Sequence, residues 1–262
     1  MDLDRESGER VGEGGNDYIV KRDVSLPRPG RGVLWLLAFF ALYLVASMLF
    51  GIKAWFDSPG LDESVEQGSE RVFEYMMSLD GIVGMYLLQF LIVLPAIVFA
   101  SRFSTQSWRV TLAMKRVGIK TVALWVGVWV VYIAISAGIG SFVKIPNGEF
   151  VELLMGSRHL GFALLSVVLA PILEESLFGG YLFKAWRSSW LGGYGTILVT
   201  SVLFLALHAG QYNWFLMSQL FVFSIILGLA REKTGSLLVP LVVHALNNLL
   251  ATVSLVYFTM EW

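Results

Sequence analysis

The sequence contains no cysteine and few charged residues for its length. Of its 262 residues, 15% are charged and 56% are hydrophobic, whereas soluble domains carry about 25% charged and 45–50% apolar residues. The absence of cysteine excludes disulfide bonds, thiolate metal sites and a cysteine nucleophile. The low charge and the high apolar content together indicate a protein that is embedded in lipid.

Acidic residues are scarce in most of the chain. Fourteen of the 20 lie in residues 1–80, and none lies in residues 81–147. In residues 153–231 the only acids are Glu174 and Glu175, which are adjacent and stand in an apolar stretch. This isolated pair is the first candidate for chemistry in the sequence.

Seven apolar runs are long enough to cross a bilayer, because about 30 Å of hydrocarbon needs roughly 20 helical residues at 1.5 Å each. The predicted fold class is therefore all-α, a polytopic membrane protein with seven transmembrane helices, or eight as the alternative. The runs lie at residues 33–52, 81–100, 121–140, 161–183, 194–210, 214–230 and 237–258.

The chain divides into three predicted regions. Residues 1–31 are polar, rich in Gly and Pro and without helical periodicity, which predicts a disordered cytoplasmic tail. Residues 32–140 would hold the N-terminal transmembrane helices and their connecting segments. Residues 141–262 would form a C-terminal transmembrane core that contains the unusual polar residues.

The distribution of lysine and arginine along the chain predicts its orientation in the membrane. With the amino terminus inside, 15 of the 19 basic residues lie in inside segments and four in outside segments. We therefore expect an integral protein of the bacterial plasma membrane with a cytoplasmic N-terminus and membrane lipid as a partner. The basic residues follow the membrane face and form no patch, so nucleic-acid binding is not expected.

Ionisable residues inside a span cost about 2.5–3.5 kcal/mol at a helix centre on translocon scales. Here they are Glu174, Glu175, His208 and His244, which include two of only three histidines in the chain. His244 and Asn248 are four residues apart and share a helix face. A single buried His or Asn more often packs than reacts, but this concentration favours a functional site.

The residue types fit the hydrolysis of an amide. A glutamate beside a histidine can deprotonate water, and a second histidine with an amide can donate hydrogen bonds to an oxyanion. The two adjacent glutamates point about 100° apart on a helix, which predicts two different roles. Other membrane proteases are disfavoured, because the chain has no HExxH, no aspartate within a span and no GxSG-type serine motif within a span.

Three ordered segments, APILEESLFGGYLF, LFLALHAG and PLVVHALNN, resemble the motifs of one family. It is the CPBP intramembrane proteases, the CAAX prenyl proteases and bacteriocin-processing enzymes also called the Abi family. The family pattern is EExxxR, then FxxxH, then Hxxx followed by Asn or Asp. The match covers residues 161 to about 250.

The resemblance implies an endopeptidase that cleaves a membrane-associated protein or peptide, prenylated proteins among them. Glu174 would be the general base, assisted by His208, and Glu175 would orient the other residues. His244 and Asn248 would form the oxyanion hole. A zinc enzyme with Glu174, His208 and His244 as ligands is the alternative. We prefer the reaction without cofactor or metal, because an amide four residues after His244 suits an oxyanion better than zinc.

The sequence departs from the family pattern at Gly179, where the family has arginine. Lys184 lies nine residues past Glu175, about 13 Å along a helix. Without a cation from another segment, burial and repulsion would keep one glutamate protonated at neutral pH. This departure leaves open a catalytically impaired protein that acts by binding, as an immunity, scaffold or regulatory factor. A proton-coupled transporter with a Glu174–His208 relay ranks third.

The depth of these residues in the membrane raises a difficulty. With seven full spans, Glu174 would lie near the middle, His208 near the outer end and His244 nearer the inner side. The three could then not meet. A broken or re-entrant helix around 188–213, where glycines cluster, would solve this problem.

Overall fold

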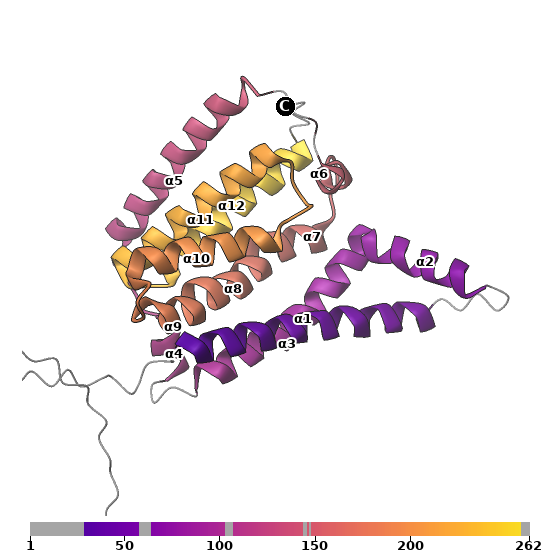
Figure 1. Cartoon of the computed structure of the whole chain (residues 1–262). Coiled ribbons are helices and arrows are strands. Elements are labelled where there is room, and N and C mark those ends of the chain that lie inside the picture. The colour runs from indigo at the N-terminus through magenta and orange to yellow at the C-terminus, as the bar shows by residue number, and fades with distance from the viewer. Residues whose placement is uncertain (1–28, 58–63, 103–106, 144–145, 147, 258–262) are drawn as a thin grey trace, which may run out of the picture.

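The structure is a computed structural model, and it describes residues 29–57, 64–102, 107–143, 146 and 148–257. Within these ranges the chain is helical and contains no strand (Figure 1). The N-terminal helices are α1 (Pro29–Asp57), α2 (Val65–Met77), α3 (Leu79–Ser101), α4 (Trp108–Thr111), α5 (Ile119–Gly140) and α6 (Glu149–Leu154). The later ones are α7 (Leu160–Leu164), η1 (Leu165–Leu169), α8 (Ala170–Glu175), η2 (Ser176–Leu182), α9 (Phe183–Arg187), α10 (Gly192–Leu207), α11 (Trp214–Thr234) and α12 (Leu238–Tyr257).

Six helices of the described chain are long and apolar enough to cross a membrane, and α10 is a shorter apolar helix. The prediction of an all-α, polytopic membrane protein is confirmed. The predicted fifth span, 194–210, differs from the others, because α10 has only 16 residues and is about 24 Å long. Helix α10 is therefore too short to cross the roughly 30 Å of bilayer hydrocarbon at full length.

The fourth spanning helix runs without interruption from Leu160 to Arg187 and is π-helical in η1 and η2. Proline has no N–H and collides with the carbonyl four residues earlier in a regular helix. The π-helical η1 ends directly before Ala170 and Pro171, and the Ala170 N–H bonds to the Leu165 carbonyl, five residues back. This wider turn accommodates the proline. η2 begins directly after Glu175, so the two glutamates lie between two π-helical stretches, which are frequent at functional sites.

Helices α10 and α11 form a hairpin through residues 208–213. Asn213 caps α11 by accepting a hydrogen bond from the Leu216 N–H at 2.9 Å. Gly235 ends α11 in the left-handed conformation at φ 63°, which glycine adopts without steric cost. The chain then turns at once into α12, and Figure 1 shows α10, α11 and α12 together beside α8.

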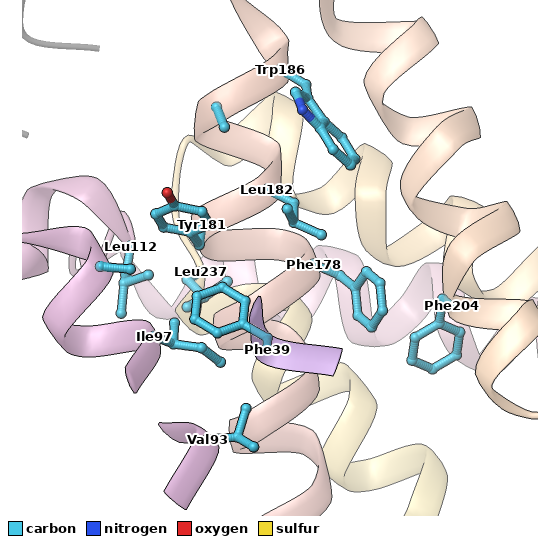
Figure 2. Close-up of a cluster of buried hydrophobic side chains, with 12 residues drawn as sticks. Phe39, Val93, Ile97, Leu112, Phe178, Tyr181, Leu182, Trp186, Phe204 and Leu237 are labelled. Atoms are coloured by element: carbon cyan, nitrogen blue, oxygen red, sulfur yellow. The ribbon is translucent and has the colours of Figure 1, made fainter. Parts of the chain in front are cut away.

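An apolar core joins the N-terminal helices to η2 and α9. Phe39 of α1 packs edge-on against Tyr181, with ring centroids 5.7 Å apart, and Ile97 of α3 belongs to the same cluster (Figure 2). On the side of α10, the rings of Phe178 and Phe204 meet at 5.6 Å. The helix that carries both glutamates is therefore fixed by side chains from α1, α3 and α10.

Most of the predicted tail, residues 1–31, lies outside the described residues. Its last three residues are helical, because α1 begins at Pro29, and proline is favoured in the first turn of a helix. The predicted orientation in the membrane and the division into three regions stay predictions.

Candidate active site

His244 lies between the two glutamates. Its Nδ1–H donates to Oε1 of Glu175 at 3.0 Å, and its Nε2 lies 3.6 Å from Oε2 of Glu174. The His244 side chain is 3% exposed. The carboxylates come from α8 and the imidazole comes from α12, 69 residues later in the chain. One imidazole therefore contacts both glutamates, each through a different ring nitrogen.

Aromatic rings hold the imidazole of His244 in place. The Phe204 ring lies edge-on at 5.9 Å from it, and the Phe223 ring lies edge-on at 5.7 Å. Both phenylalanines are buried. Packing from α10 and α11 therefore fixes the ring plane that the two glutamates face.

His208 follows the last residue of α10 and stays close to Glu174. Its Nδ1–H donates to the Phe204 carbonyl at 2.9 Å, which leaves Nε2 to act as a base or an acceptor. The Phe204 ring lies 4.7 Å from the His208 ring. His208 is within electrostatic range of Glu174. Because α10 is shorter than a full span, the depth problem that assumed seven full spans is removed, and a re-entrant segment around 188–213 stays a prediction.

The two amides of α12 have different partners. Asn248 donates from Nδ2 to the Ser166 carbonyl of η1 at 2.9 Å, and Asn247 accepts from Nε1 of Trp129 in α5 at 3.1 Å. An asparagine amide has two N–H donors. One donor of Asn248 is thus used within the protein, and the second can serve a ligand.

A cavity of about 560 Å³ brings four of the five predicted site residues into one wall, namely Glu174, His208, His244 and Asn248. Most of its other walls are apolar or aromatic side chains from α3, α5, α6, α11 and α12. Glu175 does not line this cavity. It lies behind His244 and borders a second, smaller cavity of about 30 Å³. This position suits the predicted orienting role better than a direct contact with a substrate.

Two tyrosines beside Glu174 were not predicted from the sequence. Tyr86 of α3 and Tyr212 of the α10–α11 hairpin both line the large cavity and lie within electrostatic range of Glu174. Burial, and then the Glu174 carboxylate, raise the pKa of Tyr212 to about 12. Its phenol is therefore a donor at neutral pH. Tyr212 lies four residues after His208, and this spacing could have indicated it from the sequence. In the structure the His208 ring stacks on the Tyr212 ring at 6.1 Å.

Arg231 of α11 was also missed, because the sequence counted it only as a basic residue of an inside loop. It is 6% exposed, and its Nε–H donates to the carbonyl of Gly179 at 2.7 Å. It is also within electrostatic range of Glu175. A cation from another segment is therefore present, and the protonation of one member of the glutamate pair stays a prediction.

The remaining histidine, His159, has a structural setting. Its Nδ1 accepts from the Phe162 N–H at 3.0 Å, and its Nε2 lies 2.8 Å from Oδ1 of Asp80. It thus caps α7 and joins it to the first turn of α3, which agrees with the expectation that His159 is outside the site.

The geometry does not assemble a zinc site. Within the described ranges, no group of three or more His, Asp or Glu side chains is placed to hold a metal ion. The Nδ1 atoms of His208 and His244 are both in hydrogen bonds, an arrangement that zinc-ligating histidines share because they bind through the other nitrogen. Metal dependence therefore stays a prediction to test.

Comparison with known proteins gives the family of this region. Residues 156–250 match the family model for Rce1-like proteins, described as type II CAAX prenyl endopeptidases. The predicted resemblance to CPBP proteases is confirmed for this segment. It contains all five predicted site residues and Arg231. The other regions of the chain lie outside the match.

A curated relative adds little about activity. The chain is 32% identical over 124 residues to an uncharacterised 24.3 kDa protein of Escherichia coli, an alignment that covers 44% of this chain. The chain spans about half of that relative's length, 55%. No solved structure matches the chain.

Proposed function

We propose that the chain is an intramembrane endopeptidase of the CAAX type in which Glu174 activates the attacking water. The observation that supports this most is the shared cavity wall of Glu174, His208, His244 and Asn248. It joins a base, two imidazoles and an amide donor in one apolar space. Such a cavity is large enough for a peptide segment, and its walls suit apolar side chains.

The first step is the attack of water on a peptide carbonyl. Glu174 takes one proton from the water while the water oxygen bonds to the carbonyl carbon. His208, with Nδ1–H held by the Phe204 carbonyl, accepts the other water hydrogen in a hydrogen bond through Nε2. The product of this step is a tetrahedral intermediate with a negative oxygen.

The negative oxygen is stabilised from α12. The free N–H of Asn248 donates to it, and Nε2 of His244, 3.6 Å from Oε2 of Glu174, takes over the proton that Glu174 removed from the water and donates it beside Asn248. This proton then returns through Glu174 to the departing amine and the C–N bond breaks. The hydroxyl proton of the new carboxyl group follows by way of Glu174, so a carboxylate and an ammonium group leave. Glu175 holds Nδ1–H of His244, so the ring keeps its orientation throughout.

The substrate is a membrane-associated protein or peptide, and a prenylated protein is one candidate. The cavity is lined by spanning helices, among them α3, α5, α11 and α12, so a substrate enters it from the lipid or from the membrane surface. A neutral or apolar chain near the cleaved bond fits these walls, because burying an unpaired charge there is costly.

The experiment compares protein termini by mass spectrometry in cells that carry the wild type or Glu174→Gln at matched membrane levels. Glu70→Gln is the control, because Glu70 is an exposed glutamate of α2. We expect new protein termini in the wild type and in Glu70→Gln, and we expect them to be absent in Glu174→Gln. The sequences of these termini would also identify the substrate.

Identical termini in all three strains would refute the endopeptidase. If a cellular effect of the protein then persists in Glu174→Gln, the protein acts by binding. A metal chelator added to the purified, active protein tests the zinc alternative separately, since the proposed reaction needs no metal.

A further inference from the structure

Arg231 is a buried charge that the proposed reaction does not yet use. Among the described residues, the buried acidic and basic side chains are Glu175, Arg231 and His244, at 5%, 6% and 3% exposure. These three side chains come from α8, α11 and α12, and they lie near one another in the fold. A buried charge persists only when partners compensate its lost hydration, so the partners of Arg231 indicate its role.

Three contacts define the place of Arg231. Its Nε–H donates to the Gly179 carbonyl at 2.7 Å, and its guanidinium lies 5.0 Å from the centre of the Phe183 ring. The third is the charge of Glu175, which is within electrostatic range. The guanidinium is thus fixed by one hydrogen bond to Gly179 and one aromatic ring.

Gly179 lies next to both the Glu175 carboxylate and the Arg231 guanidinium. A Cβ atom built on Gly179 would lie 2.7 Å from Oε2 of Glu175 and 3.0 Å from Cδ1 of Leu237. The Glu175 carboxylate therefore rests against the bare backbone of Gly179, while the carbonyl of the same residue receives Arg231. The missing side chain at position 179 provides the space for this arrangement.

The other acid close to Arg231 already has a matched partner. Both oxygens of Glu232 accept from Arg187, at 2.7 Å from Nε and 2.8 Å from Nη2. This forked pair satisfies the Glu232 charge. Arg231 lies within electrostatic range of Glu232 and Arg187 as well. Glu175 is the acid that shares Gly179 with Arg231, because its Oε2 lies 2.7 Å from the Cβ position of Gly179 while Arg231 bonds to the carbonyl of that residue.

We propose that Arg231 is a positioning residue, which holds Glu175 so that it accepts the Nδ1–H of His244 and leaves Nε2 of His244 facing Glu174. Only the expected effect of Arg231 on catalysis rests on the proposed function. The effect of Arg231 on the proton position of His244 is independent of it and can be measured without a substrate. In this chain, a cation from α11 thus serves the acid pair in place of one at position 179.

The test is the protonation pattern of His244, read by ¹⁵N NMR of histidine-labelled protein in micelles. Only three histidines occur in the chain, and a His244→Asn variant assigns the signal. We compare wild type, Arg231→Met and Arg231→Lys. Lys233→Met is the matched control, because it removes one positive charge from the same end of α11 at an exposed position.

In the wild type and in Lys233→Met, we expect His244 to carry its proton on Nδ1. In Arg231→Met, the Nδ1–H signal should fall at least twofold in favour of Nε2–H, which free imidazoles prefer, and Arg231→Lys should recover part of it. In a Glu175→Gln background, Arg231→Met should cause no further change. Wild-type ¹⁵N shifts of His244 in Arg231→Met would overturn the proposal. It would also be overturned if Arg231→Met changed the His244 signal equally with and without Glu175→Gln.

Cleavage gives a second readout that separates this proposal from the proposed function. If the chain is a protease, the new termini should form about tenfold more slowly in Arg231→Met, with partial rescue by Arg231→Lys. An intact ¹⁵N result with no cleavage in the wild type would refute the protease alone. Unfolded Arg231→Met protein is recognised by its lost signal dispersion. Arg231→Lys then decides: the proposal predicts an Nδ1–H signal that is only partly recovered, and a fully wild-type ¹⁵N pattern would overturn it.

Discussion

Replacing Gly179 with alanine tests whether the Glu175 carboxylate rests against the helix backbone. The added methyl group would lie 2.7 Å from Oε2 of Glu175, whereas ordinary contacts begin at 3.4 Å. The carboxylate must therefore move by about 0.7 Å. Because a carboxylate is the end of a flexible side chain, the collision itself is cheap to relieve, and the cost comes from the hydrogen bond to His244 that the movement breaks.

The size of the effect follows from two opposing contributions. A hydrogen bond to a charged group contributes about 1.5–3 kcal/mol, and alanine is favoured over glycine in a helix by up to about 1 kcal/mol. Gly179→Ala should therefore lower the free energy of unfolding by about 0.5–2 kcal/mol. The control is Gly127→Ala in α5, where a Cβ would meet nothing within 4 Å; it should stabilise the protein by about 0.5–1 kcal/mol.

The assay is thermal unfolding of the purified variants in one detergent, followed by tryptophan fluorescence, together with the ¹⁵N spectrum of His244. We expect Gly179→Ala to unfold at a lower temperature than the wild type and to change the His244 signal, and Gly127→Ala to do neither. A Gly179→Ala protein as stable as Gly127→Ala, with an unchanged His244 signal, would refute the contact between Glu175 and the Gly179 backbone.

Three further predictions concern the cavity. Glu174→Gln should slow cleavage by at least about 100-fold at an unchanged unfolding temperature; residual cleavage above that level would exclude Glu174 as the base. Asn248→Leu should reduce the cleavage rate by about 10²–10³, whereas Asn247→Leu, which loses only the bond to Trp129, should reduce it far less, and equal losses would contradict the oxyanion role. The third concerns Tyr212, whose pKa of about 12 exceeds the usual value of about 10. The neutral phenol therefore stabilises the fold below pH 10, and this contribution disappears between pH 10 and 12. Tyr212→Phe should flatten the fall in unfolding temperature over that range, and an equal slope would contradict it.

The sequence by itself determined the features that depend on local spacing. Apolar runs of bilayer length predicted the spanning helices, since each backbone bond of a helix closes within its own segment. Polar residues in those runs identified Glu174, Glu175, His208, His244 and Asn248, because few side chains of this kind are tolerated there without a function. The spacing of four residues placed His244 and Asn248 on one face of a helix, and both line the same cavity.

Only the tertiary structure decided how these residues meet. The contact of His244 with Glu175 joins residues 69 positions apart, and no local periodicity encodes the register between α8 and α12. The same holds for Arg231, which from the sequence is one basic residue of a loop end but in space lies against Gly179 and beside Glu175. Packing between helices fixes these distances to within an ångström, because a buried charge keeps its place only where its partners lie. The local sequence determines which residues are unusual, and the packing of the helices determines which of them share one site.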